Sequence, residues 1–269
     1  MPPPAADAPC PEQAFNATAL KWHTCAWLLL PVLVFLAGWM HWYAALPLTL
    51  LTAAGLAPRK RKEPQTRDSL PAFPLFTRSS FLALAAFAAL MALSGWGEWV
   101  NQHPDHIVRN ACLRELVASP WPVIFPDGNV LIYNTGFWLV PALAGKLAGL
   151  DAARMLVVLW GAWGLFLSWL WLCVFSGRRS LLLALLMAAF GSLLNLQCWL
   201  GLNLFRLHYF GTAEQIMCSA NASIPVLLFF IFLASGRMPL YWMPILFAAT
   251  AFYSPLAALG GLPLAACQW

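Results

Sequence analysis

The sequence predicts an all-α integral membrane protein, a multispanning bundle of about seven to nine hydrophobic helices. Of its 269 residues, 61% are hydrophobic and only 9% are charged. A water-soluble domain of this composition would lack the charged surface that it needs, so lipid must be the solvent for much of the chain. Long apolar runs follow one another with short gaps, and neither strand alternation nor a fixed-period repeat accompanies them.

The N-terminal part predicts a short tail and three spans. Residues 1–21 lack the basic segment and cleavage site of a secretory signal, so we expect a disordered tail before a transmembrane helical domain over 22–269. The apolar stretch 22–56 is too long for one span and barely long enough for two, because a helix rises about 1.5 Å per residue. We therefore predict two short helices that turn near His41 to Tyr43, and a third span over 80–97.

Basic residues predict the topology. Five of them crowd into one loop between predicted spans: Arg59, Lys60, Arg61, Lys62 and Arg67. We interpret this block as a cytoplasmic loop and not as a nucleic-acid contact, which places residues 98–134 in a large external loop. Counting 133–150 as a full span would put Arg178 and Arg179 outside, so we expect that stretch to be partly inserted or packed on the outer face.

The C-terminal half predicts further spans by the same criteria. We expect spans at 155–175, 181–200, 224–235 and 240–254, a cytoplasmic turn at 176–180, and a second external loop at 201–221. The last apolar run begins at Leu256 and stops at Trp269, which suggests truncation inside a helix.

The first external loop holds the richest set of polar residues. Residues 103–123, HPDHIVRNACLRELVASPWPV, predict a short surface helix with Pro104 in its first turn and Ser119-Pro120 at its end. One half of its helical wheel carries the polar side chains Asp105, His106, Arg109, Asn110 and Arg114. Such a face can supply a carboxylate, a general acid or base, and cations for a phosphate. The simpler alternative is an ordinary ion pair between Asp105 and Arg109 on a wet helix.

Three segments resemble one family. They are residues 97–155, which contain Pro-Trp-Pro-Val, then 208–230, HYFGTAEQIMCSANASIPVLLFF, and 252–265, FYSPLAALGGLPLA. Over roughly residues 75–269 the chain is similar to bacterial multispanning proteins of glycosyltransferase type C architecture. The resemblance implies transfer of a sugar from a polyprenyl-phosphate donor to an extracytoplasmic acceptor, in the inner membrane and at its periplasmic face. Membrane lipid and the donor are the implied partners, and protein partners are unknown.

The resemblance also implies roles for single residues. Asp105 matches the external acidic residue that acts as a base or as a ligand of a divalent cation, Mg or Mn, and Asn110 matches the Asn of a His-Asn pair. Arg109 stands where His is expected, and its charge would weaken Asp105 as a base. His208 and Glu214, in the second external loop, are the other catalytic candidates. The predicted substrate-binding residues are His106, Arg109, Asn110, Arg114, Trp121 and Tyr133.

Two other functions remain open. A transporter or flippase also needs a helix bundle, although the predicted spans carry few ionisable residues at mid-membrane. A non-catalytic or incomplete membrane protein would explain Arg109 and the abrupt C-terminus. The seven Cys residues show no zinc-binding spacing. Cys112 and Cys218 would share an external compartment, so they could form a disulfide, or stay as two separate thiols.

Overall fold

Helices make up most of the part that the structure describes, a computed structural model of residues 17–58, 77–100, 102–190 and 211–266. Within these ranges the β-type pairing is a single isolated bridge between Ile124 and Val130. The longer helices are α1 (Ala17–Trp39), α2 (Trp42–Leu56), α3 (Arg78–Leu93), α4 (Pro104–Ala118), α5 (Gly136–Ala148), α6 (Leu150–Ser176), α7 (Leu181–Ala189), α9 (Thr212–Ala234) and α10 (Met243–Tyr253). The short ones are η3 (Leu240–Trp242), α11 (Pro255–Gly260) and α12 (Leu262–Ala266).

Three helices are long and apolar enough to cross a membrane: α1 over Thr18–Trp39, α6 and α9. In each of them every Asp, Glu, Lys and Arg lies within the first five residues of the helix. Four further apolar segments are shorter: α2, α3, α5 and Leu240–Tyr253. The chain is therefore a helical protein with three candidate membrane spans, and a larger number of spans remains a prediction.

Helix boundaries follow the N-terminal prediction with one correction. The break between α1 and α2 falls at Met40 and His41, as expected from the length of the apolar stretch. However, α1 begins at Ala17, so residues 17–21, which we assigned to the tail, are already helical. The rest of that tail, residues 1–16, lies outside the described residues.

Helix α9 begins within the segment that we predicted as the second external loop. Residues 212–221 belong to α9. The backbone N–H of Gly211 donates a hydrogen bond to the Glu214 side chain and so caps the first turn of this helix. A glutamate at this position satisfies a backbone donor that the helix start leaves free, which favours helix over loop. Residues 191–210, with the first ten residues of the predicted loop and the second half of the preceding span, lie outside the described residues.

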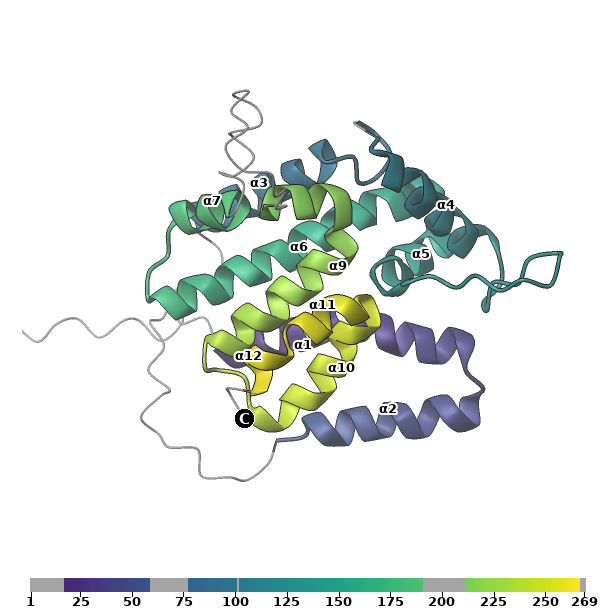
Figure 1. Ribbon diagram of the computed structural model, residues 1–269, viewed down its shortest axis with the longest axis horizontal. Coiled ribbons are helices and arrows are strands. Elements are labelled where there is room, and N and C mark those ends of the chain that lie inside the picture. The colour runs from purple at the N-terminus through teal and green to yellow at the C-terminus, as the bar shows by residue number, and fades with distance from the viewer. Residues whose placement is uncertain (1–16, 59–76, 101, 191–210, 267–269) are drawn as a thin grey trace, which may run out of the picture.

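Helix α6 is the centre of the bundle, and α3, α5 and α9 pack along it (Figure 1). Close packing depends on small residues at the crossings. A Cβ on Gly164 would lie 2.6 Å from Ile224 of α9 and 2.7 Å from Trp27 of α1. These contacts leave no room for a side chain, so Gly164 lets the three candidate spans approach one another, as small residues do in membrane bundles.

Helix α5 matches the interpretation of 133–150 as less than a full span. It has 13 residues, about 20 Å of helix at 1.5 Å per residue, against about 30 Å for the hydrocarbon core. Its Lys146 donates a hydrogen bond to the Ser119 carbonyl and lies 5.0 Å from the ring centroid of Trp121. Helices α4 and α5 are thus joined at the end of the molecule where α6 begins (Figure 1).

Candidate functional site

Helix α4 begins and ends at or next to the residues that the sequence predicts as its boundaries. His103 precedes it in extended conformation and accepts a hydrogen bond from the Asp105 backbone N–H, and Pro104 occupies the first turn, where a missing N–H costs nothing. The helix ends at Ala118, one residue before Ser119. The predicted surface helix is therefore present with nearly the expected bounds.

The polar half of α4 is divided between two environments. His106 and Arg109 are buried against the protein, with 1% and 7% of their surface exposed. Asn110 and Arg114 instead face the segment that follows α3. Ile107 and Val108, expected on the apolar side, are largely exposed. The candidate residues therefore form two groups, one on the side of α9 and one on the side of Glu98 and Gln102.

The group on the side of α9 joins α4 to a break in that helix. Ser219 leaves helical conformation, with φ −152° and ψ 44°. The carbonyls beside the break accept side-chain donors: Trp96 Nε1 is 2.8 Å from the oxygen of Ile216, and His106 Nε2 is 2.9 Å from that of Met217. Because a carbonyl only accepts, Nε2 carries the proton in the neutral imidazole. The break thus gives α4 its attachment to α9.

Charge and burial act together at His106. Its burial lowers the pKa, the bond to the Met217 carbonyl raises it, and the nearby Arg109 cation lowers it again. The net result is a pKa below the ordinary 6.5. His106 Nδ1 is also buried without a hydrogen-bond partner among the described residues. His106 is therefore a neutral structural contact at pH 7.

Asp105 lies at the outer edge of this group. Its Oδ2 is 3.6 Å from Arg109 Nη2 and 3.7 Å from His103 Nδ1, and about half of its side chain is exposed. Arg109 Nη2 also donates to Ser219 Oγ at 3.2 Å, while its Nε and Nη1 are buried without a partner among the described residues. The i,i+4 pair considered from the sequence is therefore present. Asp105, Arg109 and Glu214 all lie within electrostatic range of Cys218, which brings two of the three catalytic candidates into one region.

The group on the other side of α4 centres on Glu98. Its Oε2 accepts hydrogen bonds of 2.5 Å from both Arg114 Nη2 and Arg154 Nη2, and Arg154 Nη1 bonds Asp151 Oδ1 at 2.8 Å. Burial alone would raise the pKa of Glu98, but the hydrogen bonds and charges of the two arginines outweigh it and hold the pKa below its ordinary value. Glu98 is thus a carboxylate that ties α4 and α6 to the segment after α3.

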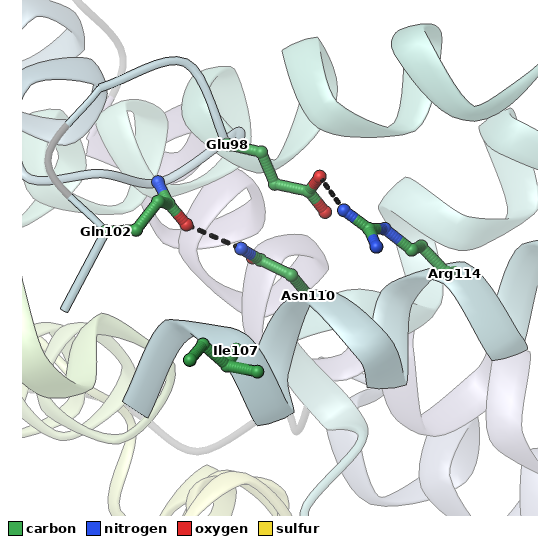
Figure 2. Close-up of a pocket in the computed structure, with 5 residues that line it drawn as sticks. All are labelled: Glu98, Gln102, Ile107, Asn110 and Arg114. Atoms are coloured by element: carbon green, nitrogen blue, oxygen red, sulfur yellow. Dashed lines mark hydrogen bonds and ion pairs between the residues drawn. The ribbon is translucent and has the colours of Figure 1, made fainter. Parts of the chain in front are cut away.

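A pocket of about 270 Å³ lies between this segment and α4 (Figure 2). Four polar residues and one aliphatic residue line it: Glu98, Gln102, Asn110, Arg114 and Ile107. Glu98 and Gln102 were not among the predicted site residues. The sequence Gly-Trp-Gly-Glu at 95–98 could have indicated Glu98 as a site residue. Its two glycines adopt positive φ, and the turn that they form directs the charged residue back toward the bundle.

The other predicted residues lie apart from the pocket or outside the described chain. Trp121 donates from Nε1 to the Leu116 carbonyl at 2.8 Å and stacks near Trp39, and Tyr133 contacts Trp138. Both are thus involved in packing. His208 lies outside the described residues.

A divalent cation at Asp105 was implied by the resemblance, and a disulfide between Cys112 and Cys218 was one of two alternatives. Across the described ranges, no three His, Cys, Asp or Glu side chains gather closely enough to hold a metal ion. Asp105 faces a cation in Arg109, whereas Mg and Mn need several oxygen ligands, so a divalent cation at Asp105 stays a prediction. Cys112 and Cys218 are both free thiols in the structure.

Comparisons of the chain with models of protein families, with curated proteins and with solved structures find no match.

Proposed function

We propose that the protein is a membrane glycosyltransferase of type C architecture that transfers a sugar from a polyprenyl-phosphate donor to an acceptor hydroxyl. The observation that carries the proposal is the half-exposed carboxylate of Asp105, on a helix outside the three candidate spans and 3.6 Å from the guanidinium of Arg109. A lipid-linked donor needs such a site beside the membrane. We place the protein in a bacterial inner membrane with α4 at its periplasmic face.

The proposed reaction uses both members of this pair. The acceptor oxygen attacks the anomeric carbon and forms the new C–O bond, while the bond from that carbon to the donor phosphate breaks. Asp105 takes the proton of the acceptor hydroxyl, and the phosphate leaves with the bonding electron pair. Arg109, whose guanidinium is 3.6 Å from Asp105, supplies the positive charge that neutralises the leaving phosphate.

The position of charge supports an enzyme over a transporter. In α1, α6 and α9 the ionisable residues lie at the first turns, so the middle of each candidate span is free of Asp, Glu, Lys and Arg. Coupled transporters place such groups near the centre of the bilayer. The described ion pairs lie instead around α4 and the start of α6, among Glu98, Asp105, Arg109, Arg114, Asp151 and Arg154.

The test is transfer by the full chain in lipid nanodiscs, with radiolabelled polyprenyl-phosphate mannose and polyprenyl-phosphate glucose as donors and a membrane extract as acceptor. Asp105→Asn should reduce transfer about 100-fold or more, as expected for loss of a general base. Asp127→Asn is the matched control, because Asp127 is an exposed turn residue whose partner Asn129 can still donate to an amide oxygen. Transfer by Asp105→Asn at the rate of the control would refute the proposal.

A further inference from the structure

The pocket between α4 and the residues Glu98 and Gln102 contains hydrogen-bonding groups that no described residue uses. Glu98 Oε1 is buried without a partner, and nine-tenths of the Glu98 side chain is buried. Asn110 uses one Nδ2 proton, in a 2.7 Å bond to Gln102 Oε1, which leaves its Oδ1 and second proton free among the described residues. Arg114 uses Nη2 for Glu98, which leaves Nε and Nη1. Two acceptors and three donor atoms thus surround one small pocket.

These groups are held in fixed positions. Gln102 Nε2 donates to the carbonyls of Gly95 at 3.0 Å and Val100 at 2.9 Å, so its amide cannot rotate without losing both bonds. Glu98 is held by Arg114 and by Arg154 of α6. A ligand therefore meets an arrangement that is already formed, which reduces the entropic cost of binding.

The charge of the pocket selects against ions. A phosphate would approach the carboxylate of Glu98, and an ammonium group would approach the guanidinium of Arg114, so each would meet repulsion close to its attraction. A neutral hydroxyl avoids both penalties because it can donate to a carboxylate or amide oxygen and accept from an amide or guanidinium. Ile107 adds an aliphatic surface on which the C–H groups of a ring can pack.

We infer that this pocket binds adjacent hydroxyl groups of a neutral sugar ring, with Glu98 and Asn110 as acceptors and Asn110 and Arg114 as donors. Its volume of about 270 Å³ is slightly below the range of pockets for drug-sized ligands, which begins near 300 Å³, and is suited to a single ring. Asn110 and Arg114 point from α4 toward the segment that carries Glu98 and Gln102 (Figure 2).

The sugar pocket is distinct from the site of Asp105. Asp105 belongs to the group on the side of α9, whereas the pocket lies on the side of Glu98 and Gln102. This inference rests on the proposed function for its biological meaning. It adds that the sugar is bound by residues other than Asp105, which takes the proton, and Arg109, which neutralises the phosphate. It also assigns to Arg114 a role in hydroxyl binding, and not in phosphate binding.

Binding of simple sugars to the full chain tests this inference. We would place the protein in phosphatidylcholine nanodiscs, free of glycoside detergents, and measure saturation-transfer NMR with methyl α-D-mannopyranoside and methyl α-D-glucopyranoside. Asn110→Leu keeps the approximate size of the side chain and does not weaken the helix, because Leu has the higher helix propensity, but it removes the polar groups. It should weaken binding of the preferred glycoside about tenfold or more, which corresponds to the loss of well-placed hydrogen bonds.

Two variants serve as controls. Ala111→Leu introduces the same side chain at the next, exposed position of α4, outside the pocket lining, and should bind as the wild type does. Asp105→Asn should also bind the glycoside normally, so failure of the catalytic proposal remains distinguishable from failure of this one. The inference is overturned if neither glycoside binds the wild type, if Asn110→Leu binds equally well, if Ala111→Leu loses binding to the same extent, or if inorganic phosphate displaces the sugar.

Discussion

Glu98 accepts a 2.5 Å hydrogen bond from Arg154, a residue 56 positions later in the chain and in the second turn of α6. This contact attaches the segment after α3 to the start of a candidate span. Since Arg114 of α4 bonds the same carboxylate oxygen, one side chain connects three parts of the molecule. The position of α4, and with it both groups of candidate residues, depends on this connection.

Glu98→Gln should destabilise the protein. The substitution keeps the size of the side chain but leaves two guanidinium groups without their shared anion. Hydrogen bonds to charged groups contribute about 1.5–3 kcal/mol each, so the free energy of unfolding should fall by roughly 2 kcal/mol or more. The measurement is unfolding in nanodiscs followed by fluorescence of the 15 tryptophans. Glu115→Gln, on α4 and without an ion pair to this cluster, should change stability by less than about 0.5 kcal/mol, and an equal loss would contradict the prediction.

Gly97→Ala should also displace Glu98. Gly97 has φ +93°, and a Cβ there would lie 3.1 Å from Val158 Cγ2 and 3.2 Å from the Arg154 carbonyl oxygen. The backbone would have to move away from α6, the helix to which Glu98 must bond. Gly128→Ala is the matched control, because Gly128 has φ +82° but open space around it. In both variants an alanine must adopt positive φ, which costs about 1 kcal/mol. Gly97→Ala should therefore lose more stability than Gly128→Ala in the same fluorescence assay, because only Gly97 also has close neighbours. Equal losses would show that the contact with α6 is unimportant.

The sequence predicted those features that depend on residues close together along the chain. The bounds of α4 follow from Pro104 and Ser119, and the break near His41 follows from the length of an apolar stretch. The sugar pocket was not predicted, because Glu98 obtains its role from Arg154 and a positive φ, neither of which is visible in local sequence. The helical wheel identified the polar half of α4, but which part of that half is buried depends on the break in α9 at Ser219.

Stability should decrease on acidification because of His106. Its folded pKa lies below 6.5, since burial and Arg109 disfavour the imidazolium more than Asp105 and the Met217 carbonyl favour it. The unfolded state then binds more protons, so this contribution is complete above pH 6.5 and is lost as the pH falls toward the folded pKa. The melting temperature of the wild type should therefore fall between pH 7.5 and 5.5.

The His106→Gln variant identifies the responsible residue. Its amide can still donate to the Met217 carbonyl but cannot be protonated, so its melting temperature should depend less on pH over this interval. His41→Gln replaces an exposed histidine at the start of α2 and should retain the wild-type slope. A wild-type slope in His106→Gln would exclude His106 as the cause.

Cys112 and Cys218 should be recovered as separate thiols that react at different rates. Both are free in the structure, and Cys112 is buried with its pKa raised to about 12 by burial. Because the thiolate is the nucleophile, Cys112 should react slowly with iodoacetamide, and the half-buried Cys218 should react first. Mass spectrometry of a non-reduced digest over a time course measures both rates. A linked Cys112–Cys218 peptide would instead establish the disulfide and show that the two segments come together.

Labelling from one side of the membrane should show that positions 105 and 214 share a compartment. Helix α6 has 27 residues, about 40 Å of helix, which exceeds the roughly 30 Å hydrocarbon core. Its first turns bond Glu98, and its last residue precedes the turn that contains Arg178. Position 178 should therefore lie on the opposite side of the membrane from α4. His106 bonds Met217, so the start of α9 lies on the side of α4.

The measurement uses single cysteines at 105, 214 and 178 in a variant whose seven native cysteines are replaced. A membrane-impermeant maleimide added to intact cells should label positions 105 and 214, and position 178 only after lysis. Ala111→Cys, exposed on α4, is the control for accessibility of that helix, and it should be labelled together with position 105. Labelling of 105 and 214 from opposite sides would refute the catalytic proposal, because Asp105 and Glu214 could not then act on one substrate. Labelling of 105 and 178 from the same side would show that α6 does not cross the membrane, and α4 would lose its proposed place beside the lipid donor.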